Sequence, residues 1–536
     1  MSPDHSLQAF IENHVALVEP ISRQAALASW QLQTESSETA KEQVTELYTR
    51  LAVIYSNKEE FELLKNISTQ SLESPELARQ HSLLVNSYLE NQLTPEQLEA
   101  MITLMVEIED IYNVFRGSVK GEKVSDNVIE QILAESDEEA LRREAWEASK
   151  EVGIAVSAKV LKLVRMRNEA AHALGFENYY SMSLELQELS EERLFTLLDQ
   201  LGTESTTLWN AYRDELDASL AKRFHITPNQ VRSWHHHNRF FQSPEPGEAN
   251  LDRFFETADL EKTAAAFFRN IDLPIEDLLE IADLYERPGK CQHAFCMDVD
   301  RKGDVRVLCN LQPNERWMST LMHEYGHAVY DKFTDHSLPY LLRTPAHIMT
   351  TEAIALLMGR LTKDANWLHI YVGVDRTESD RIAQAAQSEV RNHLLVFMRW
   401  CLVMAHFERA MYHDPEQDLN TLWWDLVEKY QRIQRPEGRN FPDWASKIHL
   451  ATSPVYYHNY QLGEMIASQL LHALRTQILV GETESALVTS PKVGEWLRDK
   501  VFYPGALRPW EEWLEHATGE KLNPQYFVAD LQGDPK

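Results

Sequence analysis

The stretch that decides the fold is RWMSTLMHEYGHAVYDKF, residues 316–333. Its apolar and polar residues recur with a helical period, so His323 and His327 are predicted one turn apart on the same face of a helix. Two imidazoles placed in this way can reach one tetrahedral zinc ion, and Glu324 lies beside them, where it can take a proton from water. The competing interpretation is a chance HExxH sequence on a solvated helix, in a chain that contains 21 histidines.

A catalytic zinc site needs a third protein ligand, and the stretch TPAHIMTTEAIALLMGRL, residues 344–361, offers one. Glu352 is predicted in the first turn of an apolar-periodic helix, after enough chain for a loop and a return to His327. A glutamate in a first turn also favours the helix dipole, which is the structural alternative. His347 is a competing ligand, although its context, TPAH, is typical of a loop. The sequence therefore predicts one zinc ion per chain, held by the two histidines and Glu352.

Most of the remaining chain shows the spacing of helices. Apolar residues follow a helical period almost continuously to about residue 285 and again from about 350 to 535. The one convincing extended element is HAFCMDVDRKGDVRVLCNL, residues 293–311, where two short runs flank the turn signal DRKGD. Helix resumes at Pro313, with Asn314 as its cap. The sequence predicts a mainly helical, all-α fold with a small β ribbon, in a single domain over residues 1–536.

The composition excludes some classes of partner. The chain has 536 residues, 43% of them hydrophobic, which is enough for a large core. Its 52 basic and 83 acidic residues give a net charge of −31, spread along the predicted helices. Such a surface repels nucleic acid and anionic membranes, so we expect neither as a partner. The charge serves solubility; a weaker interpretation is a mild preference for cationic substrates.

The sequence also bears on the cellular location of the protein and on the redox state of its cysteines. No apolar run approaches the length of a membrane span, and the start, MSPDHSLQAFIENHV, lacks the basic flank and apolar run of a signal peptide. We therefore expect a cytoplasmic protein, unless a signal was already removed. Four cysteines are too few for a disulfide framework and form no CxxC pair, so free thiols are expected.

The motif also carries a family resemblance. HExxH with Gly326 in its fourth place, followed by a glutamate on a later helix, resembles the glutamate-ligand zinc peptidases (gluzincins), which include angiotensin-converting enzyme and thimet oligopeptidase. Further stretches similar to the angiotensin-converting enzyme family span most of the chain: LASWQLQTESSETA (27–40), REAWEASKEVGIAVSAKVLKLVRMRNEAAHALGFENYYSM (143–182), CQHAFCMDVDRKGDVRVLC (291–309) and SKIHLATSPVYYHNYQLG (446–463).

The resemblance implies an architecture. It implies an elongated, two-lobed zincin-like body with a deep central cleft and the zinc ion on its floor. Lid helices are expected at about residues 1–115, a zinc-binding core at about 290–360 and substrate-binding helices at about 440–536. The implied partners are oligopeptide substrates, and the implied assembly is a monomer or simple homodimer.

The resemblance also implies roles for individual residues, and each has the alternative of an ordinary core or surface residue. In the catalytic step, Glu324 matches the general base that also carries a proton to the leaving amine. His449 matches a histidine that hydrogen-bonds the substrate or tetrahedral intermediate, and Lys447 matches a lysine that holds a free C-terminal carboxylate. Tyr457 matches a substrate contact, and Tyr460 a donor to the developing oxyanion. The zinc ligands match His323, His327 and Glu352.

Several positions depart from the family pattern. Tyr456 directly precedes Tyr457, so the tyrosine assignment could shift by one residue. Leu356 stands where the family places an aspartate that supports a zinc histidine, so that partner is absent or comes from elsewhere. His293 lies one residue further from its cysteine than in the family and is the expected contact to the substrate backbone. The family's pair of cysteines implies a Cys291–Cys309 disulfide, which a cytoplasm would keep reduced.

The glutamine that shares the substrate carboxylate with the lysine has no clear match. The nearest stretch is RSWHHHNRFF, residues 232–241, which offers His235 or His236. We take His236 as the predicted substrate-binding residue. A metal patch or a plain surface feature remain alternatives for the three histidines.

The preferred hypothesis from the sequence is a zinc metallopeptidase that releases dipeptides from free C-termini. An endo-acting oligopeptidase like thimet oligopeptidase or oligoendopeptidase F is the alternative. A zinc hydrolase with another substrate and a non-catalytic peptide-binding scaffold are more distant hypotheses. The scaffold hypothesis expects damage among the metal-binding and base residues, all of which are present.

Overall fold

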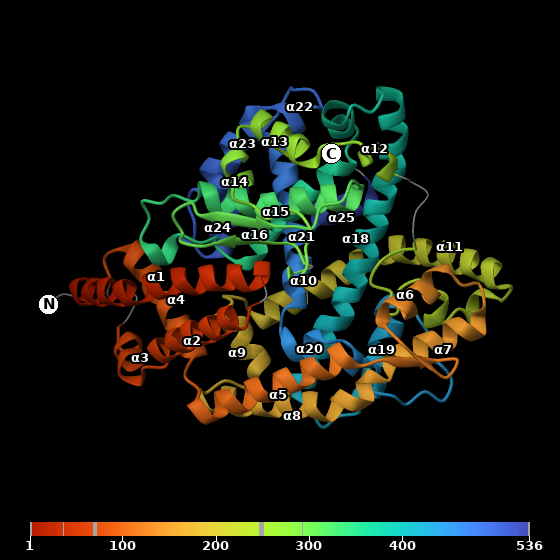
Figure 1. The fold of residues 1–536 in the computed structure, drawn as a ribbon, viewed down its shortest axis with the longest axis horizontal. Helices are drawn as coiled ribbons and strands as arrows, with labels where there is room; N and C mark the ends of the chain where they lie inside the picture. The colour runs from red at the N-terminus through yellow and green to blue at the C-terminus, as the bar shows by residue number, and fades with distance from the viewer. Residues whose placement is uncertain (1–2, 36, 68–71, 246–250, 292, 534–536) are drawn as a thin grey trace.

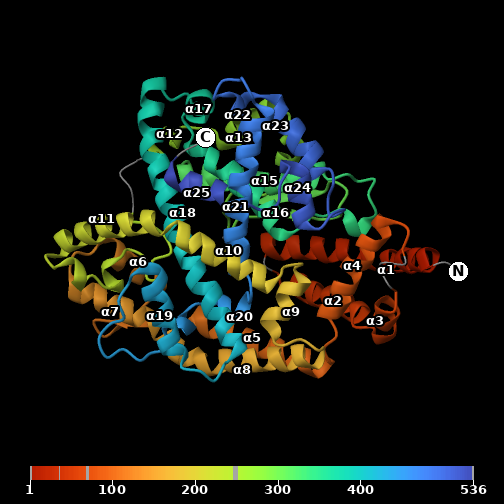
Figure 2. The same ribbon diagram turned by 180° about the vertical axis from the view of Figure 1, so that it is seen from behind.

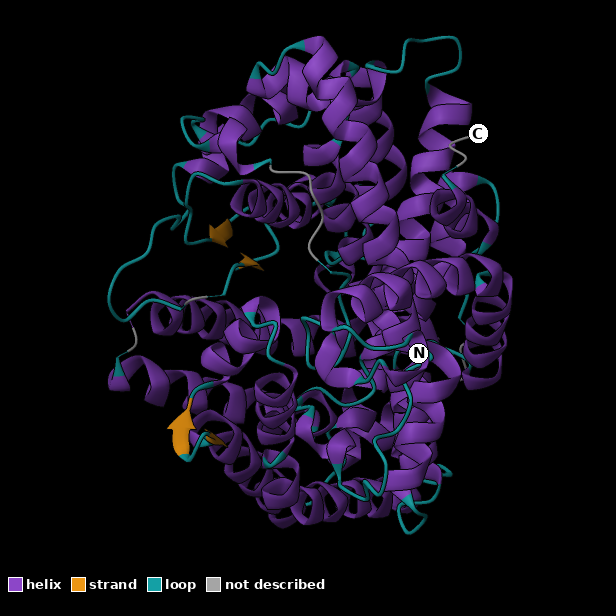
Figure 3. Ribbon diagram, turned by 90° about the vertical axis from the view of Figure 1, so that its right-hand side faces the viewer, coloured by secondary structure: helices purple, strands orange, loops and turns teal. Residues whose placement is uncertain are grey.

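Helices dominate the computed structural model, which describes residues 3–35, 37–67, 72–245, 251–291 and 293–533 (Figure 1). Among these residues the strands form only two small antiparallel ribbons, which stand out as short arrows against the helices in Figure 3. The predicted mainly helical fold is confirmed.

Four N-terminal helices gather at the left-hand end of the molecule in Figure 1: α1 (Pro3–Glu35), α2 (Glu38–Tyr55), α3 (Lys58–Lys65) and α4 (Pro75–Glu90). Helix α5 (Pro95–Val114) runs from there along the lower edge, beside α8. Side chains of Ser37, Asn57, Ser74 and Thr94 cap the starts of α2 to α5. Part of this group encloses a small core of its own around Leu64. The lid function of this region stays a prediction.

A hairpin that the sequence did not lead us to expect follows α5. Strands β1 (Gly117–Val119) and β2 (Glu122–Val124) pair around Lys120 and Gly121, whose φ angles are 54° and 78°. Two consecutive residues with positive φ are typical of the tight turn that joins hairpin strands. The sequence analysis expected one extended element, at residues 293–311, so this hairpin was missed.

The middle of the chain returns to helix. These elements are α6 (Asp126–Glu135), α7 (Glu139–Lys150), α8 (Val152–Ala173), α9 (Tyr179–Leu186), α10 (Glu191–Glu204), α11 (Thr206–Phe224), the turns η2 (Pro228–Gln230) and η3 (Ser233–His235), α12 (Asp252–Phe255), α13 (Leu260–Asn270) and α14 (Glu276–Leu279).

The predicted ribbon at residues 293–311 is present. Strands β3 (Phe295–Asp298) and β4 (Val305–Leu308) pair in antiparallel register, with Phe295 opposite Leu308. Gly303, in the turn between them, has a φ of 107°, which a residue with a side chain rarely adopts. The ribbon packs against α15, so it borders the predicted metal motif.

The C-terminal half holds the motif and the longest helix. Its elements are α15 (Glu315–Phe333), η4 (Tyr340–Leu342), α16 (Ile348–Arg360), η5 (Leu361–Lys363), α17 (Ala365–Trp367), η6 (Leu368–Val372), α18 (Arg376–His413), α19 (Leu419–Gln431), η7 (Asp443–Ser446), α20 (His449–Thr452), α21 (Tyr457–Ala473), η8 (Leu474–Ile478), α22 (Ala486–Thr489), α23 (Pro491–Trp496), η9 (Leu497–Phe502), α24 (Trp510–Thr518) and α25 (Gln525–Gln532). Figures 1 and 2 show α18 joining the upper and lower parts of the molecule.

Helices α15, α16 and α21 pack side by side and position the motif. Asn314 caps α15 as predicted, its side chain accepting the Trp317 amide at 2.9 Å. Gly326 permits the close approach of α16, because a Cβ atom there would lie 2.7 Å from the Cα of Ala355. Gly463 of α21 faces the other side of α16, near the Glu352 side chain. The glycine within HEYGH is therefore required by helix packing.

All four cysteines are free thiols, so the disulfide implied for Cys291 and Cys309 is not formed in the structure. Within the described ranges, we find no helix with the length and apolar character needed to cross a membrane.

Candidate active site

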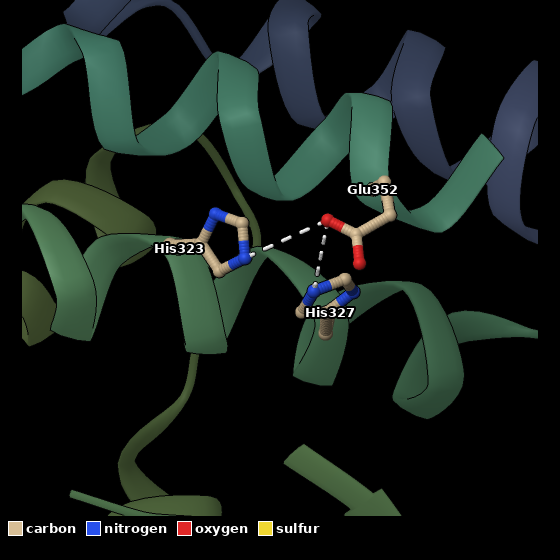
Figure 4. Close-up of side chains that lie close together, drawn as sticks. All are labelled: His323, His327 and Glu352. Carbon is tan, nitrogen blue, oxygen red and sulfur yellow. Dashed lines mark ion pairs between the residues drawn. The ribbon is translucent and has the colours of Figure 1, made fainter. Parts of the chain in front are cut away.

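The three predicted metal ligands meet between α15 and α16. One ligand atom from each of His323, His327 and Glu352 lies within 4.8 Å of the other two. The Nε2 atoms of the histidines are 3.8 and 4.0 Å from Oε2 of Glu352, and Figure 4 shows both rings turned toward that carboxylate. In the described part of the chain this is the only cluster of His, Cys, Asp or Glu with such spacing.

Helix α16 also supplies a hydrogen-bond partner for each of the two imidazole rings. Nδ1 of His327 is 2.7 Å from Oγ1 of Thr351, and the His323 ring hydrogen-bonds the backbone of Ala355. Such partners fix the tautomer and direction of a metal-binding histidine. Thr351 thus supplies a polar partner for a histidine although Leu356 replaces the family's aspartate. Sequence reasoning missed Thr351; its signal is its position directly before Glu352.

Two details of α16 differ from the prediction. The helix starts at Ile348, so Glu352 lies in its second turn, and our placement in the first turn was wrong. His347 is the N-cap residue, its Nδ1 accepting the Met349 amide at 3.2 Å. The capping role of His347 removes it from the candidate ligands, and Glu352 faces the histidines instead of serving the helix start.

The cluster has the charge properties of a zinc site. Burial lowers the pKa of His323 to about 4 and that of His327 to about 3, so both rings are neutral and carry a free lone pair at neutral pH. Burial raises the pKa of Glu352 to about 7, and burial together with Glu352 raises that of Glu324 to about 8. Neither carboxylate pairs with a lysine or arginine of the described residues. Two neutral imidazoles beside uncompensated carboxylates fit a bound Zn²⁺ ion.

Aromatic side chains extend from the cluster along α21. Burial and the charge of Glu352 raise the pKa of Tyr460 and of Tyr456, whose rings lie 5.1 Å apart. The Tyr457 ring is 5.7 Å from the Tyr460 ring and 5.2 Å from the His449 ring. Tyr456 and Tyr460 therefore lie on the Glu352 side, and Tyr457 lies on the side of His449.

His449 has hydrogen-bonding capacity left for a ligand. It is the first residue of α20, and its Nδ1 atom is buried without a hydrogen-bond partner among the described residues. Burial and the nearby Lys447 lower its pKa to about 4, so the ring is neutral. An unpaired buried nitrogen is costly unless a bound molecule completes it.

Lys447 lies in a box of aromatic rings. Its Nζ atom is 5.0, 5.4 and 5.8 Å from the ring centres of Phe240, Trp400 and Tyr457. It donates a hydrogen bond of 2.9 Å to Oε1 of Gln242. Burial lowers its pKa to about 8. An ammonium with one hydrogen bond has donors left for a further acceptor, such as a carboxylate.

Gln242 therefore occupies the place for which we had predicted His236. The His236 side chain is fully buried, with its ring 4.2 Å from that of Phe241 and Nε2 3.4 Å from Nη1 of Arg213. His235 is equally buried. Neither histidine has surface for a substrate, so the prediction was wrong. The signal for Gln242 was available in FFQSPE, immediately beyond the stretch that we considered.

His293 is exposed in the turn before β3. Its contact with a substrate backbone stays a prediction.

Comparison with known families agrees with this arrangement. A model described as Peptidase family M3 matches residues 279–533, which contain the metal cluster, Lys447 and the tyrosines. A model described as Angiotensin-converting enzyme matches residues 2–225. The two matches cover different parts of the chain, so the chain is similar to both of these peptidase families.

Individual relatives of this chain are distant. It is 23% identical to Thermostable carboxypeptidase 1 of Pyrococcus furiosus over 247 residues, which is 42% of this chain and 49% of that protein. It is 25% identical to Angiotensin-converting enzyme of Sus scrofa over 436 residues, 74% of this chain and 32% of that protein. The corresponding enzyme of Mesocricetus auratus is 24% identical over 318 residues, 54% and 23% of the two chains. The matches span about half the length of these relatives, or less.

Proposed function

We propose that this chain is a zinc-dependent peptidase that releases dipeptides from the free C-termini of oligopeptides. The observation that carries the proposal is the hydrogen bond between Lys447 and Gln242, among aromatic rings that include Tyr457, whose ring contacts that of Tyr460. A lysine with spare donors suits a terminal carboxylate. Relatives named as a carboxypeptidase and as angiotensin-converting enzymes support the same class of reaction.

The spacing within the site supports release of a short unit. The ring centres of Tyr460 and Tyr457 are 5.7 Å apart, and the Lys447 ammonium nitrogen lies 5.8 Å from the Tyr457 ring centre. Two extended residues span about 7 Å, and the side chains at either end supply the remaining reach. A carboxylate held at Lys447 would place a peptide bond close to the chain end toward the cluster, which supports release of a short unit.

The chemistry divides among a few residues. His323, His327 and Glu352 would hold the zinc ion, which when bound supplies Lewis-acid polarisation of the scissile carbonyl. The buried Glu324 lies directly beside His323 on α15; as a carboxylate it takes a proton from the attacking water and delivers it to the leaving amine. Tyr460 keeps its hydroxyl proton because burial raises its pKa, so it can donate to the oxyanion.

His449 and Lys447 would act on the substrate without exchanging protons with it. The neutral His449 ring has an unpaired buried nitrogen next to Tyr457, in reach of a substrate carbonyl or the oxyanion. Lys447 fixes the chain end by charge. The oligopeptide is thus held at its end and its scissile bond, which is the orientation that lowers the entropic part of the barrier.

An endo-acting oligopeptidase is the second candidate, because the family M3 match covers the half of the chain that holds the site. The two candidates differ in what they require of the substrate end. We would compare one peptide with a free C-terminus against its C-terminally amidated form, with an N-acetylated form as control, and identify products by mass spectrometry. We expect the free acid and its N-acetylated form to lose dipeptides, and the amide to be cleaved about tenfold more slowly. Equal rates on acid and amide, with internal cuts, would establish the endo-acting candidate.

A further inference from the structure

The turn that carries Gln242 is irregular in shape but firmly held. The Arg142 guanidinium donates to the carbonyls of Trp234, His235 and His236 at 2.8, 2.9 and 3.0 Å. Gln431 donates through Nε2 to the carbonyls of Phe240 and Phe241 at 3.2 and 2.8 Å. Both donating side chains are buried. This stretch contains the three adjacent histidines, for which the proposed reaction has no use.

One carboxylate closes the turn. Oε1 of Glu245 accepts the backbone N–H of His237 at 3.0 Å, and it lies 3.4 Å from Nδ1 of His237 and 3.7 Å from Nδ1 of His236. Ser243 lies 3.3 Å from the other ring nitrogen of His237. Glu245 thus joins the two ends of residues 237–245, which we call the Gln242 turn. Although burial opposes ionisation, the two histidines hold the pKa of Glu245 below its usual range.

The far side of the turn is fixed through His236. Its ring packs at a tilt against that of Phe241, which precedes Gln242 and has a φ of 49°, a left-handed conformation that is strained for a phenylalanine. Arg213 lies 3.4 Å from Nε2 of His236 and forms an ion pair with Asp217. The strained Phe241 therefore contacts the His236 ring, and Nδ1 of that ring faces Glu245.

We propose that Glu245 is a positioning residue for the carboxylate clamp: by bridging the two ends of the Gln242 turn and facing His236, it holds the Gln242 amide against Lys447. This inference rests on the proposed function, in which Lys447 binds the C-terminal carboxylate. Glu245 itself does not touch the substrate. Its loss releases the His237 amide and removes the carboxylate that faces the His236 ring beside Phe241, so Gln242 no longer restricts the Lys447 side chain.

The test uses Glu245→Ala and, should that variant fold poorly, Glu245→Gln, which keeps an acceptor for the His237 amide. Glu139→Ala is the matched control, because Glu139 also lies beside a histidine of this group, 3.3 Å from Nε2 of His235, but outside the Gln242 turn. We expect Glu245→Ala to raise KM for the free-acid peptide about tenfold with kcat unchanged, as for a lost charged hydrogen bond. KM for the amidated peptide should stay the same, and Glu245→Gln should recover part of the loss.

A double-mutant cycle separates positioning from general destabilisation. If Glu245 acts through Gln242, then Glu245→Ala should change KM less than about twofold in a Gln242→Ala background. Equal effects of Glu245→Ala on the acid and the amide, or full additivity with Gln242→Ala, would overturn the inference. A wild-type protein that cleaves acid and amide equally would instead overturn the proposed function, and the clamp inference with it.

Discussion

His323, His327 and Glu352 project from two packed helices, α15 and α16, whereas Lys447 follows the short turn η7 and its partner Gln242 comes from an irregular turn. The first group is fixed by helix geometry and by Gly326 at the helix contact. The second group is fixed by individual hydrogen bonds from distant side chains, such as Gln431. The proposed site therefore pairs a rigid helical metal cluster with a separately supported group for binding the substrate end.

In the proposed function, this difference separates cleavage of the peptide bond from recognition of the C-terminal end of the substrate. Changes at the helix pair should affect chemistry or the stability of the whole fold, because α15, α16 and α21 form its centre. Changes at the clamp should affect which peptides are cut, while the metal cluster stays intact. Substitutions in each group can therefore test whether the separation holds.

The largest effect is expected at Glu324. Replacing it by Gln keeps the shape and removes the base, so kcat should fall about a thousandfold, the range of general acid–base catalysis. The metal ligands are untouched, so the zinc content measured by elemental analysis should match that of the unchanged protein. Retained activity would contradict the assignment of the base, and a loss of metal would show that the two groups on α15 cannot be separated.

The next effect concerns stability at the helix contact. A methyl group at Gly326 would lie 2.7 Å from the Cα of Ala355, and backbone at that position has little room to yield. We expect Gly326→Ala to lower the free energy of unfolding by about 3 kcal/mol, measured by denaturant or thermal unfolding. Gly359→Ala is the matched control on α16, because its nearest neighbour would be 3.4 Å away, an ordinary contact. Equal stability of the two variants would refute the close-packing explanation for the glycine in HEYGH.

Residues placed by regular secondary structure could be predicted from the sequence, whereas residues placed by contacts distant in sequence could not. Helical spacing alone placed His323 and His327 on one face, and the ribbon near residue 300 was visible from its turn residues. Gln242 was not predictable, because an irregular turn is defined by partners such as Gln431, far away in sequence. Thr351 was missed for another reason. We expected the helix to begin close to Glu352, whereas it begins at Ile348, so we did not treat Thr351 as a helical residue that could face His327.

A smaller effect is expected at the clamp. Lys447→Met keeps the length and the aromatic contacts of the side chain but removes its charge. We expect KM for the free-acid peptide to rise about 30-fold, which corresponds to about 2 kcal/mol for a lost charge-assisted contact. The amidated peptide and the zinc content should be unaffected. If Lys447→Met slows cleavage of acid and amide alike, the lysine serves the fold instead of the chain end.

The smallest effect is a dependence on pH that distinguishes the clamp from the metal centre. Burial lowers the pKa of Lys447 to about 8, so the ammonium is present below that pH and is lost as pH rises through it. The ratio of kcat/KM for the free acid to that for the amide should fall about threefold from about pH 7.5 to about pH 8.5, because kcat/KM reports groups in the free enzyme. Groups near the metal, such as Glu324, affect both peptides and cancel in the ratio. Lys447→Arg keeps its charge throughout this range, so its ratio should stay flat. A flat ratio in the unchanged protein would have two explanations. Either burial does not lower the pKa of Lys447, or the lysine does not contact the substrate carboxylate. A direct titration of Lys447 by NMR would tell these two apart.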